Sequence, residues 1–75
     1  MNCFNILLDT VDKVKDFSGL INKFDGEFDL ISDNYVIDAK SLMGIFSLDL
    51  KKPLKLEVTN VENIEDLEVS LKKFM

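Results

Sequence analysis

The segment Ala39-Lys40-Ser41-Leu42-Met43-Gly44-Ile45-Phe46-Ser47-Leu48 is the part of this chain that decides the fold. It is too short for a long amphipathic helix and it runs toward Pro53, so it predicts a helix of about two turns. Ser41 suits the start of that helix, because a serine hydroxyl commonly accepts a backbone N–H there. The chain has 75 residues and no histidine.

The residues before this segment predict a strand and then a helix. Apolar side chains in residues 2–8 recur with a period of two, as in a strand with one buried face. Over residues 11–24 they recur at spacings of three and four, which indicates an amphipathic helix. Thr10 is a candidate N-cap for this helix, and Asp25-Gly26 is a suitable end, since glycine tolerates the left-handed geometry found there.

Two hairpin strands, a fourth strand and a last helix complete the pattern. Residues 27–30 and 35–38 alternate on either side of Ser32-Asp33-Asn34, and Asp and Asn accept the positive φ angles of tight turns. Residues 54–58 alternate after a proline, which fits the beginning of a strand. Residues 64–74 have helical spacing, with acidic residues early and lysines late, as the helix dipole favours.

The predicted order is β-α-β-β-α-β-α, in a single domain over residues 1–75. A chain of this order packs three helices on one face of a four-stranded, mostly antiparallel sheet, an α+β open-faced β-sandwich. A domain of this size can form only one small core. The predicted core consists of Phe4, Ile6, Leu8, Val14, Phe17, Ile21, Phe28, Leu30, Ile37, Ile45, Leu48, Leu56, Val58, Leu67 and Leu71.

The central segment resembles the serine-site helix of the HPr family, the phosphocarrier proteins of the bacterial sugar phosphotransferase system. Lys40-Ser41-Leu42-Met43-Gly44 and Ser47-Leu48 are similar to the family's Lys-Ser-(Ile/Leu)-Met-Gly-(Val/Ile)-x-Ser-Leu. Aligned on Ser41, the resemblance runs without gaps from about Val14 to Val58 and continues more loosely through the last helix. The element order is also that of HPr, so the resemblance implies an HPr-like fold.

The loop before the first helix departs from the family. HPr proteins have Gly-(Ile/Leu)-His-(Ala/Thr)-Arg-Pro there, and the histidine takes the phosphoryl group. The ungapped alignment puts Thr10 at the histidine, Asp12 at the arginine and Lys13 at the proline, with Asp9 just before them. A loop shortened by about three residues would instead restore the phase of the first strand. Both alignments remove the phosphate site.

No residue is therefore predicted to be catalytic, and we expect the protein not to be an enzyme. Transfer through phosphohistidine needs an imidazole nitrogen, which no other side chain replaces at similar pH. An aspartyl phosphate at Asp9 or Asp12 stays open as an alternative, although such sites normally need a divalent cation. The simpler interpretation is that Thr10 caps the helix and the two aspartates favour its positive end.

The helix after Ser41 carries the two remaining candidate sites. The resemblance implies that Ser41 is a site of regulatory phosphorylation by a kinase; the alternative is that it serves only as an N-cap. Leu42, Met43 and Phe46 are expected at the surface and are predicted to bind a partner protein, because clustered exposed apolar residues indicate a contact surface. The alternative is that they cover the core of a very small domain.

Composition limits the partners. Fourteen acidic and nine basic residues give a net charge of -5, which disfavours binding to nucleic acid. No apolar run is long enough to span a bilayer, and the start does not resemble a signal peptide. Cys3 has no second cysteine to pair with, so we expect a cytoplasmic protein, without membrane insertion. We also expect a monomer without cofactor or metal.

Two functions are compatible with this sequence. The first is an HPr-like module that has lost histidine phosphotransfer and binds a protein of the phosphotransferase system, or a related regulator, through the helix after Ser41. The second is a phosphoacceptor regulated at Ser41. In the family, Enzyme I presents an acidic docking surface. The charge of -5 therefore favours a permease-side or regulatory partner over Enzyme I.

Overall fold

The computed structural model describes residues 2–75, and its elements follow the predicted β-α-β-β-α-β-α order. A short 3-10 helix, η1, directly continues the last α-helix, so the chain turns once more after Leu71. The elements are β1 (Asn2–Ile6), α1 (Val11–Ile21), β2 (Glu27–Ser32), β3 (Tyr35–Asp38), α2 (Leu42–Phe46), β4 (Leu54–Thr59), α3 (Ile64–Leu71) and η1 (Lys72–Phe74).

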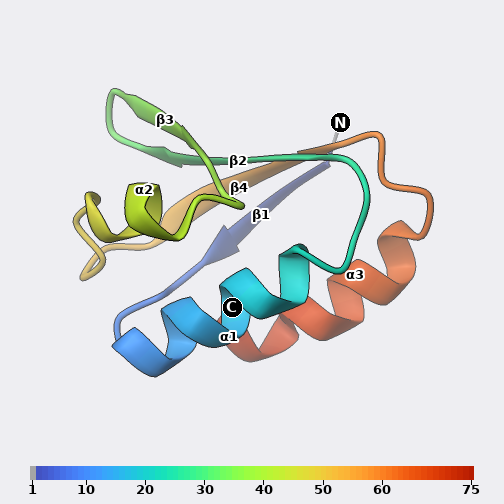
Figure 1. Cartoon of the computed structure of the whole chain (residues 1–75), viewed down its shortest axis with the longest axis horizontal. Coiled ribbons are helices and arrows are strands. Elements are labelled where there is room, and N and C mark those ends of the chain that lie inside the picture. The colour runs from blue at the N-terminus through green and yellow to red at the C-terminus, as the bar shows by residue number, and fades with distance from the viewer. Residues whose placement is uncertain (1) are drawn as a thin grey trace.

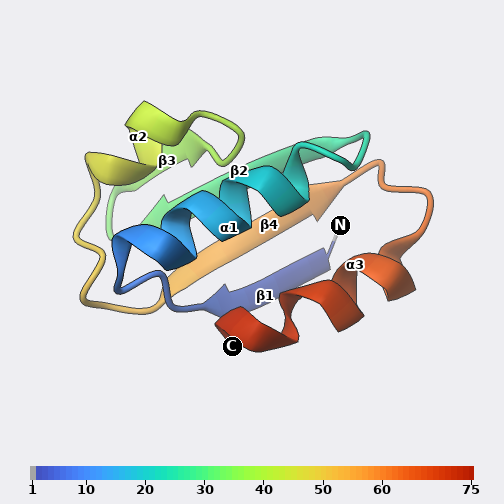
Figure 2. The same ribbon diagram turned by 60° about the horizontal axis from the view of Figure 1, so that its bottom comes forward.

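The four strands form one sheet in the order β1-β4-β2-β3, and every neighbouring pair is antiparallel. Leu56 on β4 lies opposite Phe4 on β1 and opposite Leu30 on β2. The helices cover one face of the sheet and leave the other face bare (Figure 1, Figure 2). The first and fourth strands are thus neighbours, and the expected open-faced β-sandwich is confirmed.

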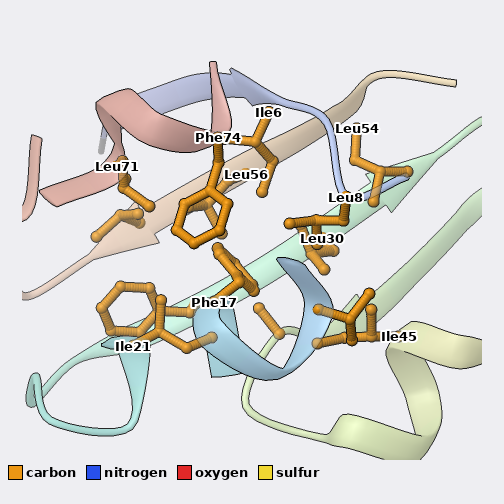
Figure 3. Close-up of a cluster of buried hydrophobic side chains, with 14 of the residues drawn as sticks. Ile6, Leu8, Phe17, Ile21, Leu30, Ile45, Leu54, Leu56, Leu71 and Phe74 are labelled. Carbon is orange, nitrogen blue, oxygen red and sulfur yellow. The ribbon is translucent and has the colours of Figure 1, made fainter. Parts of the chain in front are cut away.

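The core lies between the sheet and the helices, where side chains of α1, α3 and the inner strand positions meet (Figure 3). Phe17 and Phe74 pack edge to face, with ring centroids 5.6 Å apart. Among the predicted core residues only Phe4, Ile37 and Leu48 are less than fully buried. Ala39, Leu54 and Phe74 are buried in addition.

Two connections depend on the residue types present. Asp33, in the β2–β3 turn, has φ 52°, which is the positive angle that the sequence predicted there. Gly26 has φ 122°, and a Cβ at this position would lie 2.7 Å from Cγ2 of Val61. Both the angle and the space therefore require glycine at the entrance to β2.

Some boundaries differ from the sequence prediction. Helix α1 ends at Ile21, three residues earlier than expected, and the chain then makes two tight turns in which Lys23 N–H and Phe24 N–H donate to the carbonyls of Leu20 and Ile21. Val11 and Tyr35 fit the apolar spacing of their elements but are exposed. They lie in the first turn of α1 and at the hairpin end of β3, at the margin of the core. None of the helices within residues 2–75 is long and apolar enough to cross a membrane.

Candidate functional site

Helix α2 starts at Ser41, as the sequence predicted. Ser41 Oγ accepts a hydrogen bond from Gly44 N–H at 3.3 Å, and its carbonyl accepts from Ile45 N–H at 3.1 Å. A Cβ on Gly44 would lie 3.3 Å from Ser41 Oγ and 3.4 Å from Cδ1 of Ile37, so glycine leaves room for this tight cap. Ser41 itself is exposed, which leaves its hydroxyl accessible.

The short helix divides its apolar residues between core and surface. Ile45 is fully buried, whereas Leu42, Met43 and Phe46 are 38%, 79% and 39% exposed. Positions 42 and 46 are one turn apart and therefore share a face, with position 43 beside them. These three residues form one exposed cluster, which we call the α2 patch. The prediction that they lie at the surface is confirmed.

Helix α2 is held in place mainly by the residues just before it. Ala39 is buried and donates its N–H to the carbonyl of Phe28 at 2.8 Å. Lys40 N–H donates to a carboxylate oxygen of Asp38 at 2.9 Å. The Lys40 ammonium reaches the carbonyl of Phe24 at 2.7 Å and lies 5.2 Å from the Phe28 ring centroid, a cation–π distance. Lys40 thereby ties the start of α2 to the chain that follows α1.

The candidate loop residues Asp9, Thr10, Asp12 and Lys13 lie at the start of α1. Thr10 Oγ1 accepts from Lys13 N–H at 3.1 Å, so Thr10 is the N-cap that the sequence predicted. The Lys13 ammonium also pairs with Asp9 at 2.9 Å. This hydrogen bond lowers the pKa of the Asp9 carboxyl below its ordinary value, although Asp9 is at the surface. Asp12 lies in the same turn, near the positive end of the helix dipole.

The structure brings the α2 patch and this charged turn to the same end of the molecule. Helix α1 packs against α2, and the start of α1 lies near the segment that follows α2 (Figure 2). In this turn Thr10 is engaged in capping and Asp9 is paired with Lys13. Cys3 lies on β1, opposite Glu57 and away from α2.

One feature of the bare face was not anticipated. Asp29 on β2 lies directly opposite Asp38 on one side and Glu57 on the other, which makes a row of three carboxylates across the sheet. An open hollow of ≈ 310 Å³ borders this row, between Glu27, Phe28, Asp29 and Asp38. The Lys55 ammonium lies 3.6 Å from a carboxylate oxygen of Glu57 and offsets part of the negative charge of the row. The alternation of acidic residues in the strand sequences is the signal that could have revealed this row. Within residues 2–75 no group of three or more potential ligands is placed to hold a metal ion.

Comparison with known proteins defines the fold of this molecule. No family model matches the chain, and no curated protein matches its sequence. Among solved structures, it is similar to the crystal structure of HPr-C-His from Thermoanaerobacter tengcongensis, with a TM-score of 0.80 and 24% sequence identity. That match covers 97% of this chain and 89% of the other. The fold is therefore an HPr-like open-faced β-sandwich.

Proposed function

We propose that this protein is a non-catalytic, HPr-like binding or regulatory module that acts through the α2 patch. The observation that carries the proposal is the pairing of two features at one end of an HPr-like fold. An exposed cluster of Leu42, Met43 and Phe46 lies there. The first turn of α1, at the same end, has a threonine cap and an acidic surface instead of an imidazole.

The chemistry of the first turn supports the loss of phosphotransfer. A phosphohistidine relay needs a nitrogen nucleophile, and the chain has no histidine. The Thr10 hydroxyl accepts the Lys13 N–H as the N-cap of α1. Lys13 is paired with Asp9, so Asp9 competes with any incoming anion for its ammonium group. An incoming phosphoryl group would meet Asp12 rather than an arginine, which disfavours a negative charge there.

The α2 patch supports binding to a protein. Methionine adapts to differently shaped partner surfaces, and Met43 is the most exposed of the three residues. Ile45 below the patch and Lys40 beside it fix the helix, so little order has to be created on binding. We propose a cytoplasmic partner from the phosphotransferase system or a related regulator. The charge of -5 favours a permease-side or regulatory surface over the acidic docking surface of Enzyme I.

Two phosphorylation reactions test the first half of the proposal. The protein is incubated with Enzyme I and phosphoenolpyruvate, and separately with an HPr serine kinase and ATP, and its intact mass is measured. We expect no gain of phosphate in the first reaction. A phosphate taken from Enzyme I would contradict the loss of phosphotransfer.

Titration of partner proteins tests the second half. Met43→Asp places a charge in the centre of the patch and should weaken binding at least roughly tenfold, because a buried unpaired charge is costly. Val69→Asp is a matched control, since Val69 is 65% exposed on α3, outside the patch. Equal binding by both variants would show that the α2 patch does not bind the partner. Tight binding to Enzyme I would contradict the expected preference for a permease-side or regulatory partner.

A second candidate function rests on the position of Ser41. Its hydroxyl is exposed and lies at the start of α2, so a kinase can reach it, and the resemblance to HPr makes it a phosphorylation candidate. Phosphorylation would replace a neutral cap with an anion beside the α2 patch and so alter partner binding. A mass gain of one phosphate that Ser41→Ala abolishes would support this function. If the kinase adds no phosphate, the binding module is the function that remains.

A further inference from the structure

The two edges of the sheet differ in what their backbones offer. In an antiparallel sheet each residue turns its N–H and C=O to the same side, and successive residues alternate. Ala39 N–H donates to Phe28 O, so the backbone N–H and C=O groups of Phe28 and Leu30 point toward β3. Those of Asp29 and Ile31 point toward β4. Because this alternation continues across each pair of strands, the residue pairings show which backbone groups of β1 and β3 point away from the sheet.

The β3 edge is shorter than the β1 edge and is occupied at Asp38. On β3 the backbone N–H and C=O groups of Val36 and Asp38 point away from the sheet. The Asp38 carbonyl accepts the N–H of Ser41 at 3.0 Å, and its carboxylate accepts the N–H of Lys40. A four-residue strand with a charged, occupied end is a poor template for another strand.

The β1 edge is open. Asn2, Phe4 and Ile6 face β4, so Cys3 and Asn5 turn their N–H and C=O groups outward. Leu7 confirms the alternation, because its N–H also points outward and donates to Phe74 O at 2.7 Å. Beyond that bond, no backbone group within residues 2–75 bonds to the outer side of Cys3 or Asn5. Residues 2–6 include no charge, proline or glycine, the devices that normally protect an edge.

We propose that β1 pairs with β1 of a second copy of this chain, antiparallel about a twofold axis at Phe4, to form a continuous eight-stranded sheet. In this register Cys3 of each copy faces Asn5 of the other. The outward groups of these two residues then form four backbone hydrogen bonds, two from each Cys3–Asn5 pair. The two Phe4 rings, half-buried in one copy, meet on the helical face at the axis.

The surrounding charges favour a second copy as the occupant. On the bare face Asn5 lies beside Lys55, and Cys3 lies beside Glu57, within each copy. Because Asn5 of one copy faces Cys3 of the other, the twofold axis puts Lys55 of one copy on the same line across the sheet as Glu57 of the other. It also turns the two α3 helices, which run beside β1, antiparallel (Figure 2). The acidic start of one helix then points toward the lysines that end the other.

This interface is small, and each copy carries a charge of -5, so the association is weak and depends on salt. It differs from the monomer expected from composition, because composition does not reveal which strand edge is unprotected. Sedimentation equilibrium between roughly 10 µM and 1 mM should detect a dimer. Raising the salt from about 0.05 to 0.5 M should strengthen it by screening the repulsion. A monomer under all of these conditions overturns the proposal.

Matched variants at the two edges locate the interface. Asn5→Pro removes an outward N–H that the folded monomer does not use, so the dimer should weaken roughly tenfold or more while the circular dichroism spectrum is unchanged. Val36→Pro makes the same change at the β3 edge and should leave association unaffected. If Asn5→Pro misfolds, Asn5→Asp is used instead, with Val36→Asp as its control. A charge on the paired edge should weaken the dimer, whereas a charge on β3 should not. Loss of association in a Val36 variant, but not in an Asn5 variant, overturns the assignment to β1.

Cys3 reports the register in the unmodified chain. Two Cys3 residues offset by two positions on paired strands lie about 9 Å apart. A bis-maleimide of about that span should link two copies, and Asn5→Pro should abolish the linkage. Linkage that survives in Asn5→Pro at unchanged yield would show random collision and contradict the proposed pairing.

Discussion

Helices α1 and α2 begin alike and are stabilised differently. A hydroxyl caps each of them, Thr10 at 3.1 Å and Ser41 at 3.3 Å from the N–H group three residues later. Helix α1 then buries three side chains along eleven residues, whereas α2 buries only Ile45. The exposed start of α1 is charged, and the exposed face of α2 is apolar.

This difference separates what starts a helix from what keeps it in place. Five residues are far too few for a stable isolated helix. Helix α2 therefore depends on contacts made by its neighbours, above all those of Lys40 with Phe24 and Phe28. Helix α1 has its own buried face and can tolerate a charged, altered first turn. An exposed apolar face on α2 can thus lie beside a charged first turn of α1.

Core truncations should show the largest contrast. Phe17→Ala removes a fully buried ring that packs against Phe74, and it should lower the free energy of unfolding by about 3–5 kcal/mol. Ile45→Ala removes a smaller buried side chain and should cost less, within about 2–5 kcal/mol. Urea denaturation measures both. A larger loss for Ile45→Ala would reverse the relative anchoring of the two helices.

Lys40→Met tests the dependence of α2 on its neighbour. The variant keeps the alkyl stem but loses the 2.7 Å bond to Phe24 O, and we expect a loss of about 1.5–3 kcal/mol. Amide hydrogen exchange at Ile45 and Ser47 should speed up more than exchange in α1. Lys15→Met, on the exposed side of α1, is the control and should change neither quantity. Unchanged exchange in α2 would mean that Lys40 does not anchor the helix.

The two caps allow a direct comparison. Thr10→Ala and Ser41→Ala should each cost about 0.5–2 kcal/mol, because each leaves one helical N–H without its acceptor. The local consequence should differ: α2 should lose exchange protection throughout, whereas α1 should fray only in its first turn. Chemical shifts and exchange rates of the two variants provide this measurement. Equal local effects would show that α2 is as self-supporting as α1.

The smallest effect concerns pH and the Asp9–Lys13 pair. The hydrogen bond from Lys13 lowers the pKa of Asp9, so its contribution to stability is present above the unfolded pKa and is lost as the pH falls through the folded pKa. The pair is exposed, so the contribution is slight. NMR titration should show the Asp9 pKa rising toward its ordinary value in Lys13→Met. No such rise would mean that the pair does not persist in solution.

The sequence predicted the element order and the β2–β3 hairpin because both follow from local periodicity and turn residues. The place of β4 between β1 and β2 does not follow from chain order. Periodicity does not say where the core ends, since Val11 and Tyr35 fit the apolar spacing of their elements but are exposed. The role of Lys40 was missed because its acceptor is a backbone carbonyl sixteen residues earlier. The carboxylate row was missed because it depends on a register that puts Asp29 opposite residues of two other strands.

The pairing of β1 with β4 also has a consequence for synthesis on the ribosome. Strand β1 is made well before its neighbour in the sheet, which spans residues 54–59. At about 5–20 residues per second, β1 waits several seconds for this neighbour. During this time both of its edges are unpaired, and its uncharged sequence is available to chaperones or to other nascent chains. A growing chain of this protein therefore cannot form its sheet gradually from the first strand onward, and the sheet closes only after β4 has left the exit tunnel.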